Sequence, residues 1–213
     1  MPGARDAGAR TRDWCRRMMN DLAIVMAITG ASGAPYAVRL LEQLLAADRQ
    51  VWLIVSSHGL RLLRTEMDID SIDALRSRVG ADAWRRLVKV HDDADRGAAP
   101  ASGSTRNAGM VICPCSMGTL SAISVGASRS LVERAADVML KERRPLVLVP
   151  RETPLSAIHL QNMLRLSRAG AVILPAAPGF YNRPQSVQDL VDFIVARVLD
   201  QFGVEHALAR RWG

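Results

Sequence analysis

The stretch LAIVMAITGASGAPYAVRLLEQL, residues 22–44, decides the fold class of this protein. Residues 22–29 are an almost entirely apolar run without polar alternation, as in a strand that is buried on both faces of a parallel sheet. A glycine-rich turn follows, and residues 35–47 have the spacing of an amphipathic helix with proline in its first turn. A strand, a tight turn and a helix in this order predict the first unit of an α/β fold.

The same alternation of strand and helix continues along the chain. Further short apolar runs predict strands at residues 51–56, 110–113, 146–149 and 171–174. Helices are expected from His58 onward, in two short pieces within residues 68–88, and over residues 116–125, 131–142, 155–169 and 187–202. Residues 95–109 are rich in Gly, Ser and Pro and are predicted to form a loop. We therefore expect a three-layer, doubly wound α/β domain of the Rossmann or flavodoxin-like kind, with a mostly parallel sheet.

Length and composition favour one globular domain. The 213 residues are 49% hydrophobic and 23% charged. No apolar run reaches the roughly 18 residues that a membrane helix needs. Residues 1–20 carry five Arg and two Asp without apolar periodicity, so we expect a disordered basic arm there and a single domain over residues 21–213. The other basic residues are scattered and only three Phe and two Tyr could stack on bases, which argues against nucleic-acid binding.

Cysteine usage indicates a reducing compartment. The three cysteines, Cys15, Cys113 and Cys115, are an odd number without the spacing of a disulfide framework, so we expect a cytoplasmic protein. The CPC segment lacks the second pair of ligands that a zinc site needs, and no Asp-rich motif suggests another metal. A nucleophilic Cys115 would need a base and a lowered pKa, and no histidine is paired with it, so a small buried residue is the favoured interpretation.

Small and polar residues follow each predicted strand. In a doubly wound sheet the ligand lies beyond the carboxyl ends of the strands, so these segments should converge. They are TGASG at 29–33, VSSHG at 55–59, CPCSMGT at 113–119, VPRET at 149–153 and PAAPGFYNRP at 175–184. Gly30 and Gly33 would let helix-terminal amides approach a phosphate, although a plain tight turn also explains them. Ser56 replaces the acidic residue that nicotinamide dehydrogenases often have, although capping of the next helix by Ser57 is an alternative for this segment.

Charged residues stand where a turn does not need them. Arg151 and Glu152 lie between two prolines directly after the predicted strand 146–149, whereas ordinary turns use Gly, Asn and Asp. Arg134 and Lys141 are seven residues apart and share one helix face, which is either part of a site or an ordinary solvated face. Lys141 is one of only two lysines, against 26 arginines, which suggests that a compact charge is required there.

Two residues near the end of the chain could bind a phosphate. Tyr181 lies in a predicted loop and Arg197 in the last predicted helix, and a phenol beside a guanidinium suits a phosphate group. The alternative is an interface aromatic and an arginine on a helix surface. This segment by itself does not decide between the two.

Taken together, the segments resemble the UbiX-like flavin prenyltransferases over residues 22–203, and the run from KERRP to PRETP, residues 141–154, is the most specific part. The resemblance implies an enzyme that joins the dimethylallyl group of dimethylallyl phosphate to N5 and C6 of reduced FMN. Such enzymes need no metal, and their product is the cofactor of UbiD-type decarboxylases. Family members form homo-oligomers, commonly dodecamers, whose sites are shared between subunits.

The resemblance also implies the residues of the site. Those expected to bind FMN are Gly30, Ala31, Ser32, Ser56, Ser102, Ser104, Ser116, Met117, Gly118, Thr119 and Arg151. Those expected at the reaction centre are Ser32, Glu66, Lys141 and Glu152. The prenyl phosphate is expected to contact Arg134, Lys141, Tyr181 and Arg197, and Trp212 corresponds to a terminal aromatic that covers a neighbouring subunit's site.

Two other functions are compatible with a flavin-binding fold. An FMN-dependent cysteine decarboxylase would have a histidine after the early strands and a P-x-M-N segment, whereas this chain has VPRET at residues 149–153. A non-catalytic FMN-binding protein would need none of Lys141, Glu152, Tyr181 and Arg197. Prenyl transfer therefore accounts for more of the sequence than either alternative does.

Overall fold

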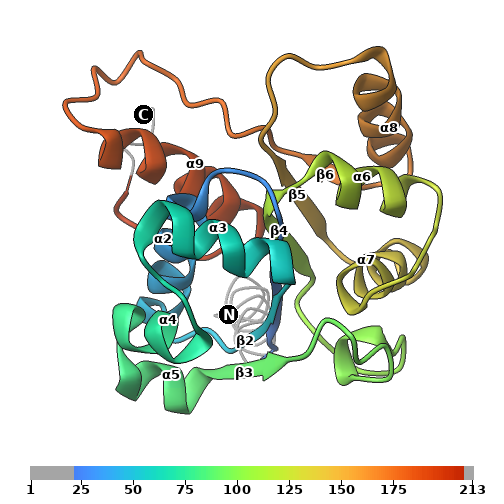
Figure 1. The fold of residues 1–213 in the computed structure, drawn as a ribbon, viewed down its shortest axis with the longest axis horizontal. Helices are drawn as coiled ribbons and strands as arrows, with labels where there is room; N and C mark the ends of the chain where they lie inside the picture. Colours follow the sequence, from blue (N-terminus) through green and yellow to red (C-terminus); the bar gives the residue numbers. More distant parts are fainter. Residues whose placement is uncertain (1–21, 209–213) are drawn as a thin grey trace, which may run out of the picture.

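One parallel sheet organises residues 22–208, the part of the chain that the computed structural model describes (Figure 1). Its six strands lie in the order β3-β2-β1-β4-β5-β6. Their bounds are β1 Ile24–Ile28, β2 Val51–Val55, β3 Val88–His91, β4 Met110–Cys115, β5 Leu146–Pro150 and β6 Val172–Ile173. The chain moves outward from β1 to β3 and then returns to place β4 on the other side of β1, which confirms the doubly wound prediction. The predicted arm at residues 1–20 and Trp212 lie outside the described residues.

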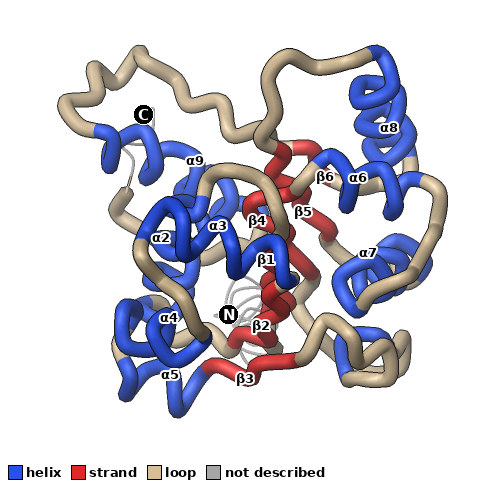
Figure 2. Tube along the Cα trace, in the orientation of Figure 1, coloured by secondary structure: helices blue, strands red, loops and turns tan. Residues whose placement is uncertain are grey.

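Helices cover both faces of this sheet (Figure 2). One face carries α2 (Ala34–Ala46), α3 (Ser57–Met67), α4 (Ile72–Val79), α5 (Ala81–Leu87) and α9 (Val187–Gln201). The other face carries α6 (Met117–Ser124), α7 (Leu131–Lys141) and α8 (Ala157–Arg168), with the short 3-10 turn η1 (Ala99–Ala101) beside α7. The three-layer arrangement is therefore the one expected from the sequence.

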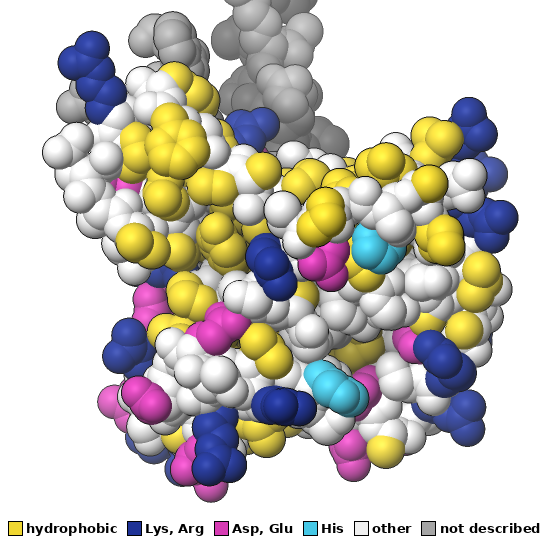
Figure 3. Space-filling model, turned by 45° about the horizontal axis from the view of Figure 1, so that its top comes forward, with side chains coloured by type: hydrophobic (Ala, Val, Ile, Leu, Met, Phe, Trp, Pro, Cys, Tyr) yellow, Lys and Arg dark blue, Asp and Glu magenta, His cyan; other side chains and the backbone are white. Residues whose placement is uncertain are grey.

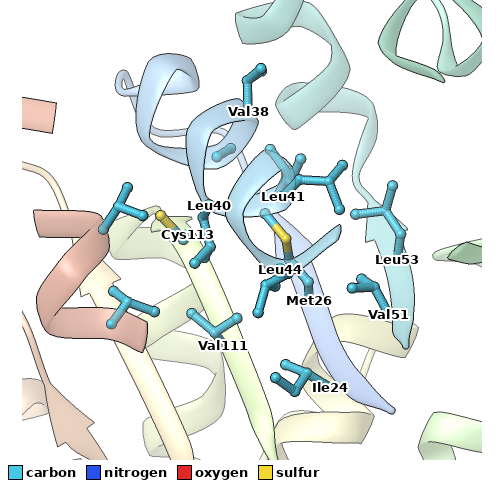
Figure 4. Packing of buried hydrophobic residues seen from close by; sticks show 14 of the residues in the cluster. Ile24, Met26, Val38, Leu40, Leu41, Leu44, Val51, Leu53, Val111 and Cys113 are labelled. Carbon is cyan, nitrogen blue, oxygen red and sulfur yellow. The ribbon is translucent and has the colours of Figure 1, made fainter. Parts of the chain in front are cut away.

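The sheet divides the hydrophobic core into two layers. All five residues of β1 are buried, and successive ones face opposite sides: Met26 packs under α2, and Val25 packs on the side of α6 and α7. Figure 4 shows Leu41 and Leu44 of α2 next to Met26 on the first of these sides. Burial on both faces is the reason why the strands appear in the sequence as continuous apolar runs.

The sequence did not predict β3. This strand pairs with β2 in parallel register, from Val88 opposite Val51, but it forms the edge of the sheet, and Val90 is 41% exposed. Four residues with a lysine among them are too short and too polar to show the pattern of a buried strand. β6 is also shorter than predicted, since only Val172–Ile173 of residues 171–174 pair with the sheet.

Candidate functional site

The candidate site lies where β1 and β4 end side by side. The chain leaves these two neighbouring strands in opposite directions, which creates the crevice in which doubly wound proteins bind ligands. We call the segments after β1, β2, β4 and β5 the carboxyl rim: residues 29–33, Ser56, 116–119 and 151–152. Figure 3 views the molecule with this end turned forward and shows hydrophobic side chains gathered across it, with charged groups between them.

Thr29 ties the turn after β1 to the end of β4. Its Oγ1 donates a hydrogen bond to the carbonyl of Pro114 at 2.8 Å and accepts one from the Ser116 N–H at 2.9 Å. The Thr29 side chain is buried, so these bonds are not in competition with water. Thr29 was not among the site residues predicted from the sequence, where its only distinguishing feature is a hydroxyl at the end of an apolar strand.

Two of the serines expected to bind FMN cap helices. Ser56 Oγ accepts a hydrogen bond from the Gly59 N–H at 3.0 Å and begins α3, and Ser116 Oγ accepts one from the Thr119 N–H at 3.2 Å and begins α6. The cap of α3 is therefore Ser56 and not Ser57, which is the first residue of the helix. The hydroxyls of Ser116 and Thr119 are 3.0 Å apart, and both lie at the rim.

The amides of Gly33 and Ala34 at the start of α2 already have a partner. The carboxylate oxygen Oε2 of Glu66 accepts hydrogen bonds from Gly33 N–H at 2.9 Å and from Ala34 N–H at 2.8 Å. Of the two interpretations that the sequence left open for this turn, a phosphate cradle and a plain tight turn, the occupied Gly33 amide favours the second at this position. Gly30 is small for another reason, since a Cβ there would lie 2.5 Å from the Cβ of His58.

Arg151 and Glu152 reach the rim from the end of β5. The Arg151 Nε–H donates to the carbonyl of Ser32 at 3.1 Å, so the guanidinium lies against the turn after β1. Its Nη groups have no hydrogen-bond partner within residues 22–208. They therefore do not help to hold the described part of the chain together. Glu152 is exposed and accepts a hydrogen bond from the Thr153 N–H at 3.1 Å. The two charges thus belong to the rim, as their position after a buried strand suggested.

Tyr181 lies beside α9, the helix that carries Arg197. The ring of Tyr181 packs edge-on against Phe193 of α9, with 5.8 Å between ring centroids, next to a cavity of about 410 Å³. Arg197 lies one helical turn beyond Phe193 and donates to Asp200 at 3.1 Å. Tyr181 is 59% exposed in a single chain.

Lys141 and Arg134 lie on α7, at its end and in its first turn. This helix begins at Leu131, whose N–H donates to the carbonyl of Asp93 at 2.7 Å. It ends before β5, whereas Glu152 follows β5, so the whole strand separates Lys141 from Glu152. Five strand residues span about 16 Å. One chain therefore holds these two residues at opposite ends of β5.

The residues around Lys141 form a compact polar cluster at the amino ends of the strands. Lys141 donates to Glu142 at 2.6 Å, and this hydrogen bond lowers the pKa of the Glu142 carboxyl. Arg144 donates to the carbonyls of Gly103 at 2.6 Å and Thr105 at 2.7 Å, which places the loop with Ser102 and Ser104 at the same edge. Arg134 is paired with Asp137 at 2.8 Å. The loop with the two serines expected to bind FMN thus lies at the opposite edge of the sheet from the rim of its own chain.

The structure therefore divides the predicted site residues into three groups. At the rim or directly beside it lie Gly30, Ala31, Ser32, Ser56, Glu66, Ser116, Met117, Gly118, Thr119, Arg151 and Glu152. Beside α9 lie Tyr181 and Arg197. At the amino edge lie Ser102, Ser104 and Lys141, and Arg134 lies apart in the first turn of α7.

The rim fits a phosphorylated aromatic ligand. Ser116, Thr119 and the α6 amides provide donors, and a side chain added at Gly118 would meet only the Ser116 hydroxyl, at 3.9 Å, so backbone is open to close approach. Cys115 is fully buried, which raises the pKa of its thiol to about 12, so the rim has no thiolate there. Within residues 22–208 no group of three His, Cys, Asp or Glu side chains could hold a metal ion.

Comparison with known proteins defines the class. The family model Flavoprotein matches residues 15–199. The flavin prenyltransferase UbiX of Pseudomonas aeruginosa is 53% identical over 197 residues, which are 89% of this chain and 93% of the relative. These matches and the rim define a doubly wound flavoprotein.

Two solved structures extend the comparison. AnUbiX (PadA1), in complex with FMN and dimethylallyl pyrophosphate, is 42% identical with a TM-score of 0.83, over 91% of this chain and 98% of that one. A dodecameric FMN-dependent Ubix-like decarboxylase of Escherichia coli O157:H7 is 45% identical with a TM-score of 0.82, over 90% of this chain and 100% of that one.

The chain belongs to the UbiX flavin prenyltransferases. This confirms the expected activity, prenyl transfer to a flavin, and the expected fold. The FMN-dependent cysteine decarboxylase TvaF is 15% identical, with a TM-score of 0.57, and shares the fold alone. The alternative of a cysteine decarboxylase is therefore not favoured.

Proposed function

We propose that this enzyme joins the dimethylallyl group of dimethylallyl phosphate to N5 and C6 of reduced FMN and thereby makes prenylated FMN. The observation that carries the proposal is the rim itself, where chain segments more than 100 residues apart, such as Ser32 and Arg151, are in hydrogen-bond contact. Reduced FMN would supply the two nucleophilic ring atoms. All other tasks fall to side chains: they bind both phosphates, orient the two partners and move protons.

The proposed flavin site is the rim. Ser32, Ser56, Ser116 and Thr119 present hydroxyls to it, and the free Nη groups of Arg151 suit a carbonyl or phosphate oxygen. The backbone at Gly118 has no large side chain in its way, so a planar ring can approach it. The fixed carbonyl of Ser32 keeps the Arg151 guanidinium in one orientation.

The proposed prenyl phosphate site uses Tyr181, Arg197, Lys141 and Arg134. Departure of the phosphate leaves developing negative charge on its oxygens, which cationic and phenolic donors stabilise. A monophosphate requires no metal bridge, and these four donors together could neutralise it. Glu152 is proposed to move the protons of phosphate release and ring closure, since it is an exposed carboxyl beside the rim. Pro150 and Pro154 restrict the backbone on both sides of it.

The proposed site is shared between subunits of a homo-oligomer. Lys141 and Glu152 lie at opposite ends of β5, so a complete site needs Lys141, and with it Ser102 and Ser104, from a neighbouring copy. The relative from Escherichia coli O157:H7 is dodecameric, and we propose the same assembly here. Exposed apolar side chains support it: Ile158 and Leu164 on α8 are 67% and 50% exposed, and Phe180 next to Tyr181 in the sequence is 69% exposed.

The cellular role follows from the product. Prenylated FMN would be delivered to a UbiD-type decarboxylase, and this delivery would take place in the cytoplasm. No helix in the described part of the chain is both long and apolar enough to cross a membrane. We further propose that residues 21–213 are one domain and that residues 1–20 form a basic arm outside it.

The decisive experiment is the incubation of the protein with FMN, a reductant and dimethylallyl phosphate, followed by mass spectrometry of the extracted flavin. We expect a flavin that is heavier by one five-carbon unit, and no change when the protein or the prenyl phosphate is left out. A flavin of unchanged mass in the complete mixture would refute the proposal.

A further inference from the structure

One long helix of this protein lacks the cap that all the other long helices have. Within residues 22–208, every helix of eight residues or more except α2 begins with a serine whose hydroxyl accepts a hydrogen bond from its own first turn. These serines are Ser56, Ser71, Ser116, Ser130, Ser156 and Ser186. The residue at the same position of α2 is Gly33, which has no side chain to act as a cap.

The backbone at Gly33 explains why no serine stands there. Its φ angle is +129°, a conformation that residues with a side chain rarely adopt, and an added Cβ would lie 3.0 Å from the ring of Tyr36. This backbone conformation lets the turn after β1 lie at the rim with the Ser32 side chain exposed. The shape of the turn thus excludes the ordinary cap.

Glu66 of α3 provides the missing cap from a distance of more than 30 residues in the sequence. Its single oxygen Oε2 accepts from Gly33 N–H at 2.9 Å and Ala34 N–H at 2.8 Å, at the end of α2 where a negative charge is most favourable. The same turn is held at Thr29 by the end of β4 and at Ser32 by Arg151. The turn is therefore fixed at its start, its middle and its end.

We propose that Glu66 is a positioning residue, which holds the turn 29–33 in the shape that binds FMN. The inference rests on the proposed function of the rim. Loss of this carboxylate would remove the acceptor of two backbone N–H groups and release the end of the turn. This assignment differs from the one that the family resemblance suggested for Glu66.

The test compares three variants of the full chain: Glu66→Ala, Glu66→Gln and Ser71→Ala. Ser71→Ala is the matched control, because Ser71 caps α4 by accepting from the Ala74 N–H at 3.1 Å, away from the rim. For each variant we would measure the melting temperature, the Kd for FMN from the quenching of flavin fluorescence, and kcat and KM with FMN as the varied substrate.

We expect Glu66→Ala to weaken FMN binding about tenfold, the equivalent of one lost helix cap. Glu66→Gln keeps a carbonyl oxygen that can accept from both amides, so a smaller loss of FMN affinity is expected. In both variants the loss should appear in KM, and saturating FMN should restore most of kcat. Ser71→Ala and Glu66→Ala should both lower the melting temperature by about 2–4 °C per kcal/mol lost, but Ser71→Ala should bind FMN normally.

Two results would overturn the inference. If Glu66→Gln binds FMN normally but loses kcat by about a hundredfold or more at saturation, Glu66 transfers protons. If Glu66→Ala loses stability as Ser71→Ala does and keeps its FMN affinity, the cap is structural only. If Glu66→Ala does not fold, the comparison of Glu66→Gln with Ser71→Ala still tests the proposal. Only a positioning role predicts a higher KM for FMN in Glu66→Gln than in Ser71→Ala. A wild-type protein that binds FMN without prenylating it would refute the proposed function and leave these binding comparisons valid.

Discussion

Arg151 and Ser32 show how much a single side chain contributes to this site. The guanidinium uses its Nε to hold the Ser32 carbonyl, so its remaining donors are presented to the rim in one orientation. A lysine could carry the same charge but could not hold the turn and present two parallel donors at once. At this scale the chemistry depends on which atoms of a residue are occupied and which are left for a ligand.

The division of labour between the two phosphates can be tested at Arg197. We expect Arg197→Ala to raise the KM for dimethylallyl phosphate about 10- to 100-fold, because a charged hydrogen bond to phosphate is lost, while the Kd for FMN stays the same. Steady-state kinetics give the KM for dimethylallyl phosphate, and the quenching of flavin fluorescence gives the Kd for FMN. Arg61→Ala, an exposed arginine on α3, is the control. Equal losses for FMN and the prenyl phosphate would contradict the division.

The role of Glu152 predicts a different result. Glu152→Gln should fold and bind FMN as the wild type does, but kcat should fall by about 10²- to 10⁴-fold, because the amide cannot move protons. The control is Glu42→Gln on α2, where the carboxylate pairs with Arg39 away from the rim. Single-turnover measurements with reduced FMN would separate the chemical step from product release. Wild-type turnover by Glu152→Gln would exclude an acid–base role.

At the scale of elements, the rim depends on contacts between strand ends and helix starts. β1 and β4 are neighbours in the sheet, and Thr29 joins the turns that follow them. Ser116 accepts from the first turn of α6 through its hydroxyl and donates to Thr29 through its backbone. The position of α6 is thus coupled to that of the turn after β1.

This coupling leads to a prediction for Thr29→Val, a substitution that keeps the shape and removes the hydroxyl. It would leave the half-buried Ser116 N–H without its acceptor, whereas the Pro114 carbonyl would keep the Thr29 N–H at 3.2 Å, and we expect a loss of about 1–3 kcal/mol in the free energy of unfolding. Chemical denaturation monitored by circular dichroism would measure it. Thr65→Val, at an exposed hydroxyl that bonds only to its own helix, is the control and should change little. Equal effects of the two substitutions would show that the link through Thr29 is not important.

At the scale of the whole molecule, one chain holds the parts of the site in three places. The rim carries the flavin groups, the α9 side carries Tyr181 and Arg197, and the amino edge carries Lys141. The exposed apolar side chains of α8 and of the loop near Phe180 lie in regions that a neighbouring copy could cover.

Shared sites predict complementation between two inactive variants. Lys141→Ala and Glu152→Gln should each lose most of their activity alone. Co-expressed in one assembly they should recover part of it, because some sites then receive Glu152 from one variant and Lys141 from the other. Size-exclusion chromatography must show assemblies of equal size, and a mixture of separately purified, non-exchanging assemblies serves as the control. Complete absence of recovery in mixed assemblies would mean that both residues act within one chain.

Much of the fold could be predicted from local pattern. The buried strands β1, β2, β4 and β5 have continuous apolar runs, and most helices begin at a serine, so both kinds of element are recognisable in the sequence. The edge strand β3 could not be predicted in this way, because only one neighbour and partial burial define it. The location of the rim could be predicted, because parallel strands all end at the same edge of a sheet.

The sequence by itself determined the class of protein, the alternation of strands and helices, and the residue types available at the strand ends. Tertiary structure alone decided which groups those residues meet: that Glu66 occupies the amides of Gly33 and Ala34, that Arg151 holds Ser32, and that β5 separates Lys141 from Glu152. The physical reason is one of range. Propensity and hydrophobic pattern act over a few neighbouring residues, whereas a hydrogen bond between distant segments exists only after the sheet has brought their ends together.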